Sequence, residues 1–256
     1  ITCRDWSSDV CSSDLDADFP VNNLVCSVFH GFTPLLLSLI NSSESIVKMI
    51  LEYDPEVDYI LNNPGHKYNG HNALHIAVIN NVEETVSLLL ANGADVNMPV
   101  RTILEIEGCL LSFTVPVMGG CTALHFAAME GNNVIARILL ENGGDLSLRI
   151  EARDGKKPFQ HAFVNGHYDL GFNLMPTRCF FEAECPLCRL NFELGDNVVI
   201  LPCGHIIQSD CWDLVNTNPE TANKCIICRA PTARYKEQIF TISSQEILDK
   251  FIAKMQ

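Results

Sequence analysis

Hydrophobic and polar positions along the first two thirds of the chain follow a pattern that recurs. Residues 69–77 and 119–127 each place a Gly-containing turn before an apolar segment that begins Ala-Leu-His. A second apolar segment follows in both cases, at 86–90 and 136–140, and a turn rich in Asn, Gly and Asp then closes the unit. Short apolar segments separated by Gly turns predict pairs of antiparallel helices.

Two weaker copies flank this pair, one opening at 31–35 and the other at 154–159. The first helices of the four units are 39, 50 and 35 residues apart, counted from Leu35, Leu74, Leu124 and Phe159. Against a helix-pair repeat of about 33 residues, the middle interval carries about 17 extra residues.

The extra residues lie near 98–118, a segment that contains two apolar runs around Gly108. We predict that this segment forms a long β-hairpin between two helix pairs. It is either a tolerated surface insertion or, because it is so apolar, a surface that covers the protein itself or a partner.

The repeated residues resemble the ankyrin repeat, with its T-P-L-H-x-A motif, two antiparallel helices and Gly-Ala-Asp type turn. The resemblance covers 16–174 and implies a mainly α solenoid of about four repeats that binds another protein. It also implies that His75 and His125 hydrogen-bond backbone groups between repeats, and we expect structural roles for His161 and His167 as well.

Seven residues near the C-terminal end have the spacing of metal ligands, in the order C-x2-C, C-x-H, C, C-x2-C. A Cys pair of this spacing can place two thiolates on one tetrahedral zinc ion, so the set supplies most of the ligands for two ions. The residues are Cys185, Cys188, Cys203, His205, Cys211, Cys225 and Cys228.

Together with Leu201-Pro202-Cys203-Gly204-His205 and Cys225-Ile226-Ile227-Cys228-Arg229, these residues resemble the RING finger over 185–230. The resemblance implies a small α+β domain with two zinc ions in a cross-brace. One site takes Cys203, His205, Cys225 and Cys228, and the other takes Cys185, Cys188 and Cys211.

The cross-brace pattern calls for a fourth ligand at position 208, which is Gln208. A neutral amide oxygen is a poor zinc ligand, so we expect this first site to be the weaker one. Three alternatives are open: Gln208 or Asp210 completes the shell through oxygen, water completes it, or the site stays weak or empty. Cys179, outside the RING register, is a further candidate ligand or a buried small side chain.

RING fingers bind a ubiquitin-conjugating enzyme on a shallow apolar groove. The resemblance assigns that groove to Leu187, Val215 and Ile226, although Trp is frequent at the second position and Pro is usual at the third. Arg229, just past the last ligand, corresponds to a residue that contacts ubiquitin and orients the thioester. The resemblance assigns no covalent catalytic residue.

A linker is expected at 175–184, because Met175-Pro176-Thr177-Arg178 breaks the helical pattern. Residues 231–256 predict a strand at 238–242 and then an amphipathic helix, with Ser243 and Glu246 as a capping box. We expect this helix to pack on the RING domain, with a homodimer contact as the alternative.

Residues 1–15 resemble the conceptual translation of a short-read sequencing adapter, and we interpret them as contamination that replaces the true N-terminus. The alternative is a Ser/Asp-rich disordered tail. This segment is therefore excluded from the reasoning about fold and function.

Charge and composition narrow the class of function. The net charge is -14, which argues against nucleic-acid binding. Six of the twelve cysteines belong to the zinc array and the rest show no paired spacing, which favours a reducing compartment. The sequence contains no run of 18 apolar residues that would predict a membrane span, and a cytoplasmic location is expected.

The sequence therefore predicts a RING-type ubiquitin ligase, whose ankyrin repeats bind a protein substrate and whose zinc domain recruits a conjugating enzyme carrying ubiquitin. The alternative is a non-catalytic ankyrin adaptor with a degenerate, structural RING domain. Gln208 favours the adaptor, whereas Leu187, Ile226 and Arg229 favour the ligase.

Overall fold

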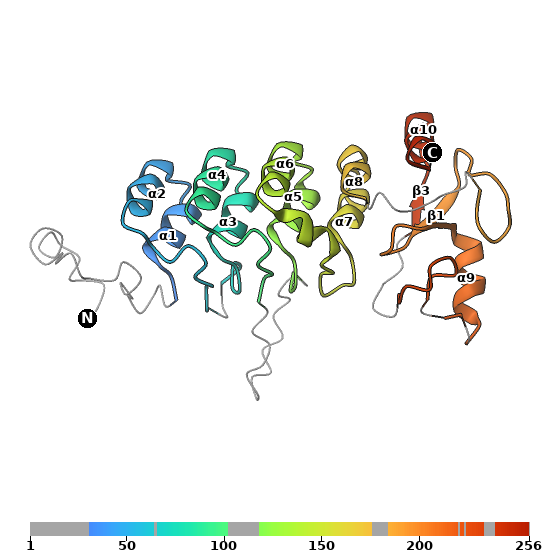
Figure 1. Ribbon diagram of the computed structural model, residues 1–256, viewed down its shortest axis with the longest axis horizontal. Helices are drawn as coiled ribbons and strands as arrows, with labels where there is room; N and C mark the ends of the chain where they lie inside the picture. Colours follow the sequence, from blue (N-terminus) through green and yellow to red (C-terminus); the bar gives the residue numbers. More distant parts are fainter. Residues whose placement is uncertain are drawn as a thin grey trace, which may run out of the picture.

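The computed structural model describes residues 31–63, 66–101, 118–175, 184–219, 221–222, 224–232 and 239–255. Within these residues, pairs of helices stand side by side in a row, and a small domain with a three-stranded sheet follows at the end of the row (Figure 1). The fold is thus mainly α with a small α+β domain, as predicted. The segment 1–15, most of the predicted hairpin at 98–118 and Cys179 lie outside the described residues.

The row contains four helix pairs and one 3₁₀ helix, all within the described residues. They are α1 (Pro34–Ile40) with α2 (Glu44–Leu51), α3 (Ala73–Ile79) with α4 (Glu83–Ala91), α5 (Ala123–Glu130) with α6 (Asn133–Glu141), η2 (Gly144–Arg149), and α7 (Pro158–Val164) with α8 (Tyr168–Leu174).

Each helix pair is preceded by a glycine in the left-handed region, at Gly31, Gly70, Gly120 and Gly155, with φ between 77° and 83°. A Cβ atom on Gly70 would lie 1.9 Å from the carbonyl oxygen of Arg101. Only glycine meets both demands, a positive φ and the close approach of the chain that leads to the following repeat. A Cβ atom on Gly31 would likewise lie 2.5 Å from the carbonyl oxygen of Asn62, so glycine allows this close approach of the chain at the first two helix pairs.

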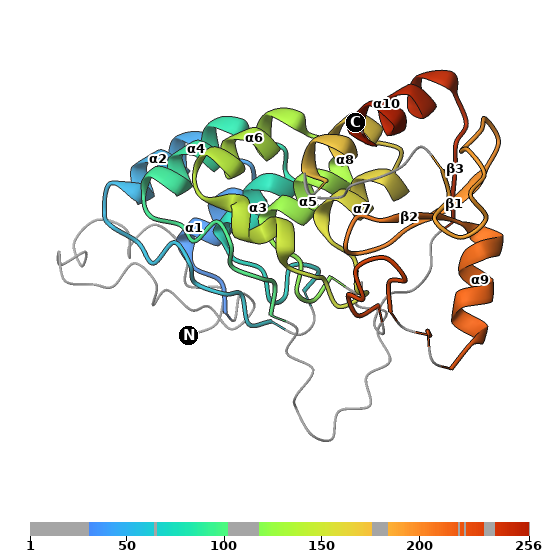
Figure 2. The ribbon, with the colours of Figure 1, turned by 45° about the vertical axis from the view of Figure 1, so that its right-hand side comes forward.

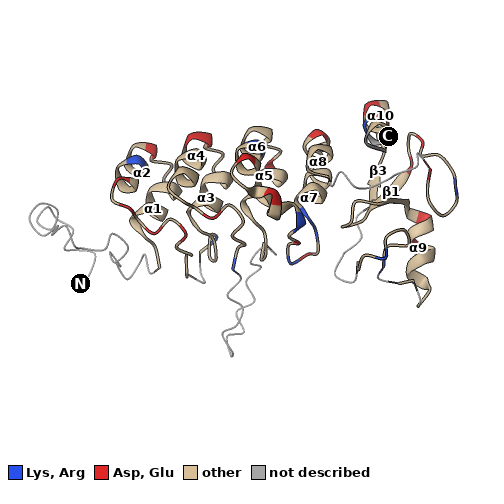
Figure 3. Ribbon diagram, viewed as in Figure 1, with Lys and Arg blue, Asp and Glu red and all other residues tan. Residues whose placement is uncertain are grey.

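The core of the row lies along the inner helices. Leu74, Leu124 and Phe159 occupy matching positions in α3, α5 and α7, and each is at most 1% exposed. Each of these helices packs against the next along the row, so every repeat buries the apolar face of its neighbour. Acidic residues lie on the outer helices α2, α4 and α8 (Figure 3).

The small domain is built on an antiparallel sheet with the order β2–β1–β3. Its strands are β1 (Asn197–Ile200), β2 (Ile206–Gln208) and β3 (Ile239–Thr241), and α9 (Ser209–Thr217) follows β2 directly. Residue pairs Ile200–Ile206 and Val199–Ile239 fix the register. Trp212 on α9 is 2% exposed and fills the small core of this domain.

The last helix, α10 (Gln245–Met255), corrects two predictions. Its cap is Ser244 rather than Ser243, because Ser244 Oγ accepts from Ile247 N at 3.3 Å. The helix also packs against α8 of the last repeat rather than on the zinc domain. Ile247 and Leu248 of this helix are buried within the single chain, and the homodimer contact given as the alternative stays a prediction.

Candidate metal centre

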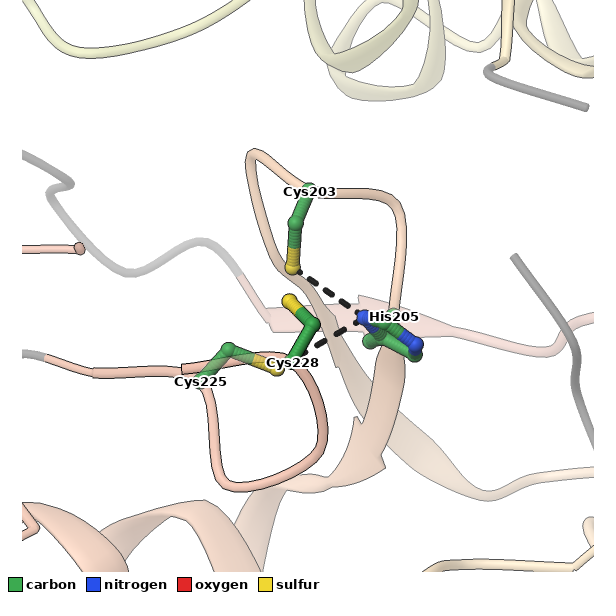
Figure 4. Close-up of side chains that lie close together, drawn as sticks. All are labelled: Cys203, His205, Cys225 and Cys228. Carbon is green, nitrogen blue, oxygen red and sulfur yellow. Dashed lines mark hydrogen bonds between the residues drawn. The ribbon is translucent and has the colours of Figure 1, made fainter. Parts of the chain in front are cut away.

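The turn between β1 and β2 and the loop after α9 bring four ligand-type residues together. Leu201 N donates to His205 O at 2.8 Å, which closes the turn that carries Cys203 and His205. His205 Nδ1 lies 3.3 Å from Cys203 Sγ and 3.6 Å from Cys225 Sγ (Figure 4). With Cys228, the ligand atoms of all four residues lie within 4.8 Å of one another.

These separations fit a single tetrahedral zinc ion. A Zn–S bond of about 2.3 Å places two thiolates about 3.8 Å apart in a tetrahedron. Three sulfur atoms and one imidazole nitrogen form a donor set that zinc favours. The second site predicted from the sequence is therefore assembled from all four of its residues.

A second cluster holds Cys185, Cys188 and Cys211, whose sulfur atoms also lie within 4.8 Å of one another. Gln208 points its side chain into this group, with Oε1 2.9 Å from Cys188 Sγ. Asp210 is not part of the group. Its carboxylate instead accepts a hydrogen bond from Ser209 Oγ at 3.4 Å. The ligands from residues 185–188 and 208–211 thus alternate along the chain with those of the other cluster, as a cross-brace requires.

Both C-x2-C segments fold into the same tight loop. Cys185 N donates to Leu190 O and Cys225 N donates to Ala230 O, each at 2.8 Å. Arg189 and Arg229, just after the second Cys of each segment, have φ values of 61° and 63°. The left-handed turn at these residues folds each loop back, so both sulfur atoms of a pair face the same point.

The pKa values of the thiols within each cluster differ. Hydrogen bonding with the Cys203 thiol lowers the pKa of Cys225 to about 3, and the same contact raises the pKa of Cys203. Burial raises the pKa of Cys211 to about 12. Burial also opposes ionisation of Cys185, but hydrogen bonds from the backbone N–H groups of Cys188 and Gln208 outweigh it and lower its pKa.

A metal ion would supply positive charge where these crowded thiols compete for protons. Bound zinc would be structural here, because metal binding by cysteine and histidine contributes directly to folding. The fit of the donor atoms supports zinc binding by this domain.

The residues predicted for the partner groove differ in exposure. Leu187 is 43% exposed, Ile226 is half-buried and Arg229 is exposed. Val215 is only 5% exposed, so its side chain belongs to the core of the domain rather than its surface. Ile227, which the sequence analysis passed over, is 43% exposed beside Ile226.

Asp196 is a further residue at the centre that sequence reasoning missed. Its Oδ2 atom accepts from Gln208 Nε2 at 3.1 Å and from Glu193 N at 2.9 Å. The residue lies 12 positions from Gln208 and outside every Cys or His motif. Only the pairing of β1 with β2 brings this carboxylate beside the amide, so ligand spacing carried no signal for it.

Stacked helix pairs and a cross-braced pair of Cys/His clusters define an ankyrin solenoid joined to a RING-type zinc domain. Comparison with known families agrees. Residues 11–99 and 101–177 match the model for ankyrin repeats, and residues 183–229 match the model for the Ring finger domain. The chain belongs to the ankyrin-repeat family and carries a RING finger after the repeats.

Some of the similar proteins are named as ubiquitin ligases, and others are not. The E3 ubiquitin-protein ligase XBAT33 of Arabidopsis thaliana is 28% identical over 158 residues, which cover 60% of this chain and 28% of the relative. The probable E3 ubiquitin-protein ligase RHC1A of Arabidopsis thaliana is 37% identical over 51 residues, or 19% of this chain and 14% of the relative.

The human B-cell lymphoma 3 protein is 29% identical over 137 residues, covering 47% of this chain and 30% of the relative. The chain thus spans less than a third of the length of these relatives. Among the described residues, no helix has the length and apolar character needed to cross a membrane.

Proposed function

We propose that this protein is a RING-type ubiquitin ligase, in which the ankyrin repeats bind a protein substrate and the zinc domain recruits a ubiquitin-conjugating enzyme. The observation that carries the proposal is the pair of cross-braced Cys/His clusters, which holds apolar side chains at the domain surface. The similarity to XBAT33 over 60% of this chain supports the same class. A cytoplasmic location remains part of the proposal.

The proposed mechanism is catalysis by positioning. A substrate amine attacks the thioester carbonyl carbon of ubiquitin, an amide bond forms and the carbon–sulfur bond breaks. The conjugating enzyme's cysteine leaves as a thiolate, which takes up the proton that the amine loses. The zinc domain forms no covalent bond during this reaction. It holds the charged conjugating enzyme so that the thioester is oriented for attack.

The apolar contact is assigned to Leu187 and Ile226, with Ile227 as an added exposed neighbour. Val215 supports this surface from the core. Leu187→Ala and Ile226→Ala are each expected to slow discharge of a charged conjugating enzyme more than tenfold, because truncating a central apolar anchor commonly costs about 2 kcal/mol. Leu190→Ala is the matched control, since Leu190 is 61% exposed outside the proposed contact.

The readout is single-turnover ubiquitin discharge with a panel of conjugating enzymes, together with zinc content to show that the domain is folded. If wild-type protein with bound zinc discharges none of the panel above background, the ligase proposal fails. Equal discharge by wild type and both groove variants would remove the groove assignment.

Arg229 is proposed to orient ubiquitin rather than bind the conjugating enzyme. Arg189 offers a matched control, because it occupies the same left-handed position in the other loop. Arg229→Ala is expected to slow discharge while binding of the conjugating enzyme persists, and Arg189→Ala is expected to leave both unchanged. Equal effects of the two substitutions would point to backbone strain instead of a ubiquitin contact.

At the first cluster we propose that the Gln208 amide oxygen is the fourth donor to zinc, which gives two zinc ions per chain. An ionised carboxylate only accepts hydrogen bonds. The contact with Asp196 therefore requires the NH₂ group of Gln208 to face Asp196, which turns Oε1 toward the Cys188 sulfur. Carboxylates commonly orient metal-binding histidines in the same way.

Asp196 is thus a positioning residue for the metal centre. An amide oxygen remains a weaker donor than thiolate or imidazole, so the first ion should leave to chelator before the second. Gln208→His should bind zinc more tightly and raise the melting temperature of the zinc domain.

Competition against graded chelator tests this ligand assignment. Gln208→Ala and Asp196→Ala are each expected to lower first-site affinity about tenfold or more and leave the other site unchanged. Gln245→Ala is the matched control, because Gln245 donates to Asp249 in a similar amide–carboxylate pair on α10. Unchanged affinity in Gln208→Ala would show that water or another residue completes the site, and a loss in Cys179→Ser would identify that residue.

A non-catalytic ankyrin adaptor is the second candidate. Two observations favour it: the amide at position 208 and the buried Val215 at the groove position where Trp is frequent. The discharge assay with metal-replete protein separates the two functions, because an adaptor binds its partner without discharging any charged conjugating enzyme.

A further inference from the structure

The fourth helix pair departs from the second and third at one capping residue. In α3 and α5 a histidine Nδ1 accepts from the backbone N–H that precedes the helix, at Asn72 for His75 and at Thr122 for His125, over 3.2 and 3.0 Å. In α7 this residue is Gln160, whose Oε1 accepts from Lys157 N at 3.0 Å. Glutamine therefore keeps the local cap.

The other end of this side chain reaches beyond its own repeat. His75 Nε2 lies 2.9 Å from Met98 O, in the chain that leads toward the third repeat. Gln160 Nε2 instead donates to Ile200 O at 2.8 Å, and Gln160 is only 3% exposed. Ile200 ends β1 of the zinc domain, directly before the turn that carries Cys203 and His205. The zinc domain thus accepts from the last repeat a bond like the one that Met98 O accepts from His75 in the second repeat. The expected counterpart in the third repeat is not formed, because the buried Nε2 of His125 has no hydrogen-bond partner among the described residues.

Apolar and charged contacts extend this joint. Phe240 of β3 packs against Phe163 and Tyr168, with ring centroids 5.7 and 5.3 Å apart. Phe163 is 4% exposed, so this apolar side chain of the last repeat is buried. Lys250 of α10 pairs with Asp169 of α8, and Figure 2 shows these two helices side by side.

A helical solenoid needs a cap, because its last repeat otherwise exposes an apolar face to water. We propose that the zinc domain is the C-terminal cap of this ankyrin solenoid, with Gln160 and Phe240 as the residues that couple the two. Metal binding then stabilises α7 and α8 as well as the zinc domain, because metal binding energy becomes folding energy and neighbouring units share interface energy.

Coupling of this kind has a consequence for the protein's binding surfaces. The repeats and the groove around Leu187 are held at one orientation instead of being joined by a free hinge. The proposal itself requires only that a metal ion folds the zinc domain, so it stands or falls independently of ubiquitin ligase activity.

Amide hydrogen exchange on the full chain, followed by mass spectrometry, tests the coupling. Removing zinc with chelator is expected to speed exchange in α7 and α8 about tenfold or more, and to leave α1 to α4 unchanged. If α7 and α8 exchange at the same rate with and without metal, the zinc domain is not the cap.

Gln160→Glu isolates the bridge from the local cap. The carboxylate still accepts from Lys157 N, but it replaces the donor to Ile200 O by a second acceptor. With zinc content unchanged, exchange in α7 and α8 is expected to rise as it does in chelator. Gln160→His, which restores the residue type of the other repeats and a ring N–H donor, should recover part of the protection.

Phe240→Ala provides a second variant should Gln160→Glu fold poorly. Ile239→Ala is its matched control on the same strand, because Ile239 is 63% exposed. Faster exchange in α7 and α8 is expected for Phe240→Ala alone. Wild-type protection in both Gln160→Glu and Phe240→Ala would overturn the proposed joint.

Discussion

The ankyrin repeats and the zinc domain reach a stable fold by different means. In the repeats, apolar residues such as Leu74, Leu124 and Phe159 are buried by the next helix pair, so stability is spread along the row. In the zinc domain, two small clusters of thiols and one histidine organise loops around a short sheet. Loss of one residue should therefore have a graded effect in the first region and an all-or-none effect in the second.

The largest effect is expected from Cys225→Ser. The substitution removes a ligand that is 0% exposed in the cluster of four, and zinc binding to such small domains is worth roughly 10 kcal/mol or more. The zinc domain should unfold while α1 to α4 keep their native spectrum. Two-dimensional NMR with zinc analysis would measure this, and a native-like zinc domain in the variant would contradict the contrast between the regions.

A cavity in the repeats should produce a smaller, graded loss. Leu124→Ala removes a fully buried side chain from α5 and is expected to lower the free energy of unfolding by about 2–5 kcal/mol. Denaturant unfolding followed by far-UV circular dichroism measures the change. Zinc content should stay at the wild-type level, and zinc loss in this variant would mean that the regions do not respond separately.

A lower pH should reduce the free energy of unfolding of the repeats, because two of their histidines are buried in the neutral form. Burial and the neighbouring His71 lower the pKa of His75 to about 3, and burial and His161 do the same for His125. The pKa of each histidine is lower in the folded state than in the unfolded state, where it is near 6.5. The free energy of unfolding is therefore highest above pH 6.5 and declines as the pH falls toward 3. From pH 7 to 5 each histidine costs up to about 2 kcal/mol.

The double variant His75→Gln, His125→Gln should flatten this pH dependence, because glutamine already caps α7 at position 160. Denaturant unfolding at pH 7 and 5, in excess zinc, gives the comparison. An unchanged slope in the variant would assign the acid sensitivity to other groups, such as the metal ligands.

The smallest effect concerns the last helix. Ser244→Ala should remove the cap of α10 and cost about 1 kcal/mol, whereas Ser243→Ala should leave stability unchanged. Exchange rates in α10 would report the difference. A larger effect at Ser243 would restore the cap assignment that the sequence pattern suggested.

Much of the fold could be predicted from local patterns in the sequence. The repeated Gly turns and apolar segments predicted the helix pairs, because each repeat obeys the same local rules. The ligand spacing identified both clusters for a similar reason, since two cysteines two residues apart meet at one point in a tight loop. Pairing and packing were harder to predict from the sequence. The groove assignment of Val215 gave no sign that its side chain is buried, and the cap of α10 was misplaced by one residue.

The sequence by itself determined the class of protein and the residues of the two metal clusters, because repeat period and ligand spacing are properties of short segments. Only the tertiary structure decided how distant segments meet. It brought Asp196 to the amide of Gln208 across the β1–β2 pair and Gln160 to Ile200 across 40 residues. Such contacts depend on how sheets and helices stack, and no local pattern encodes that geometry.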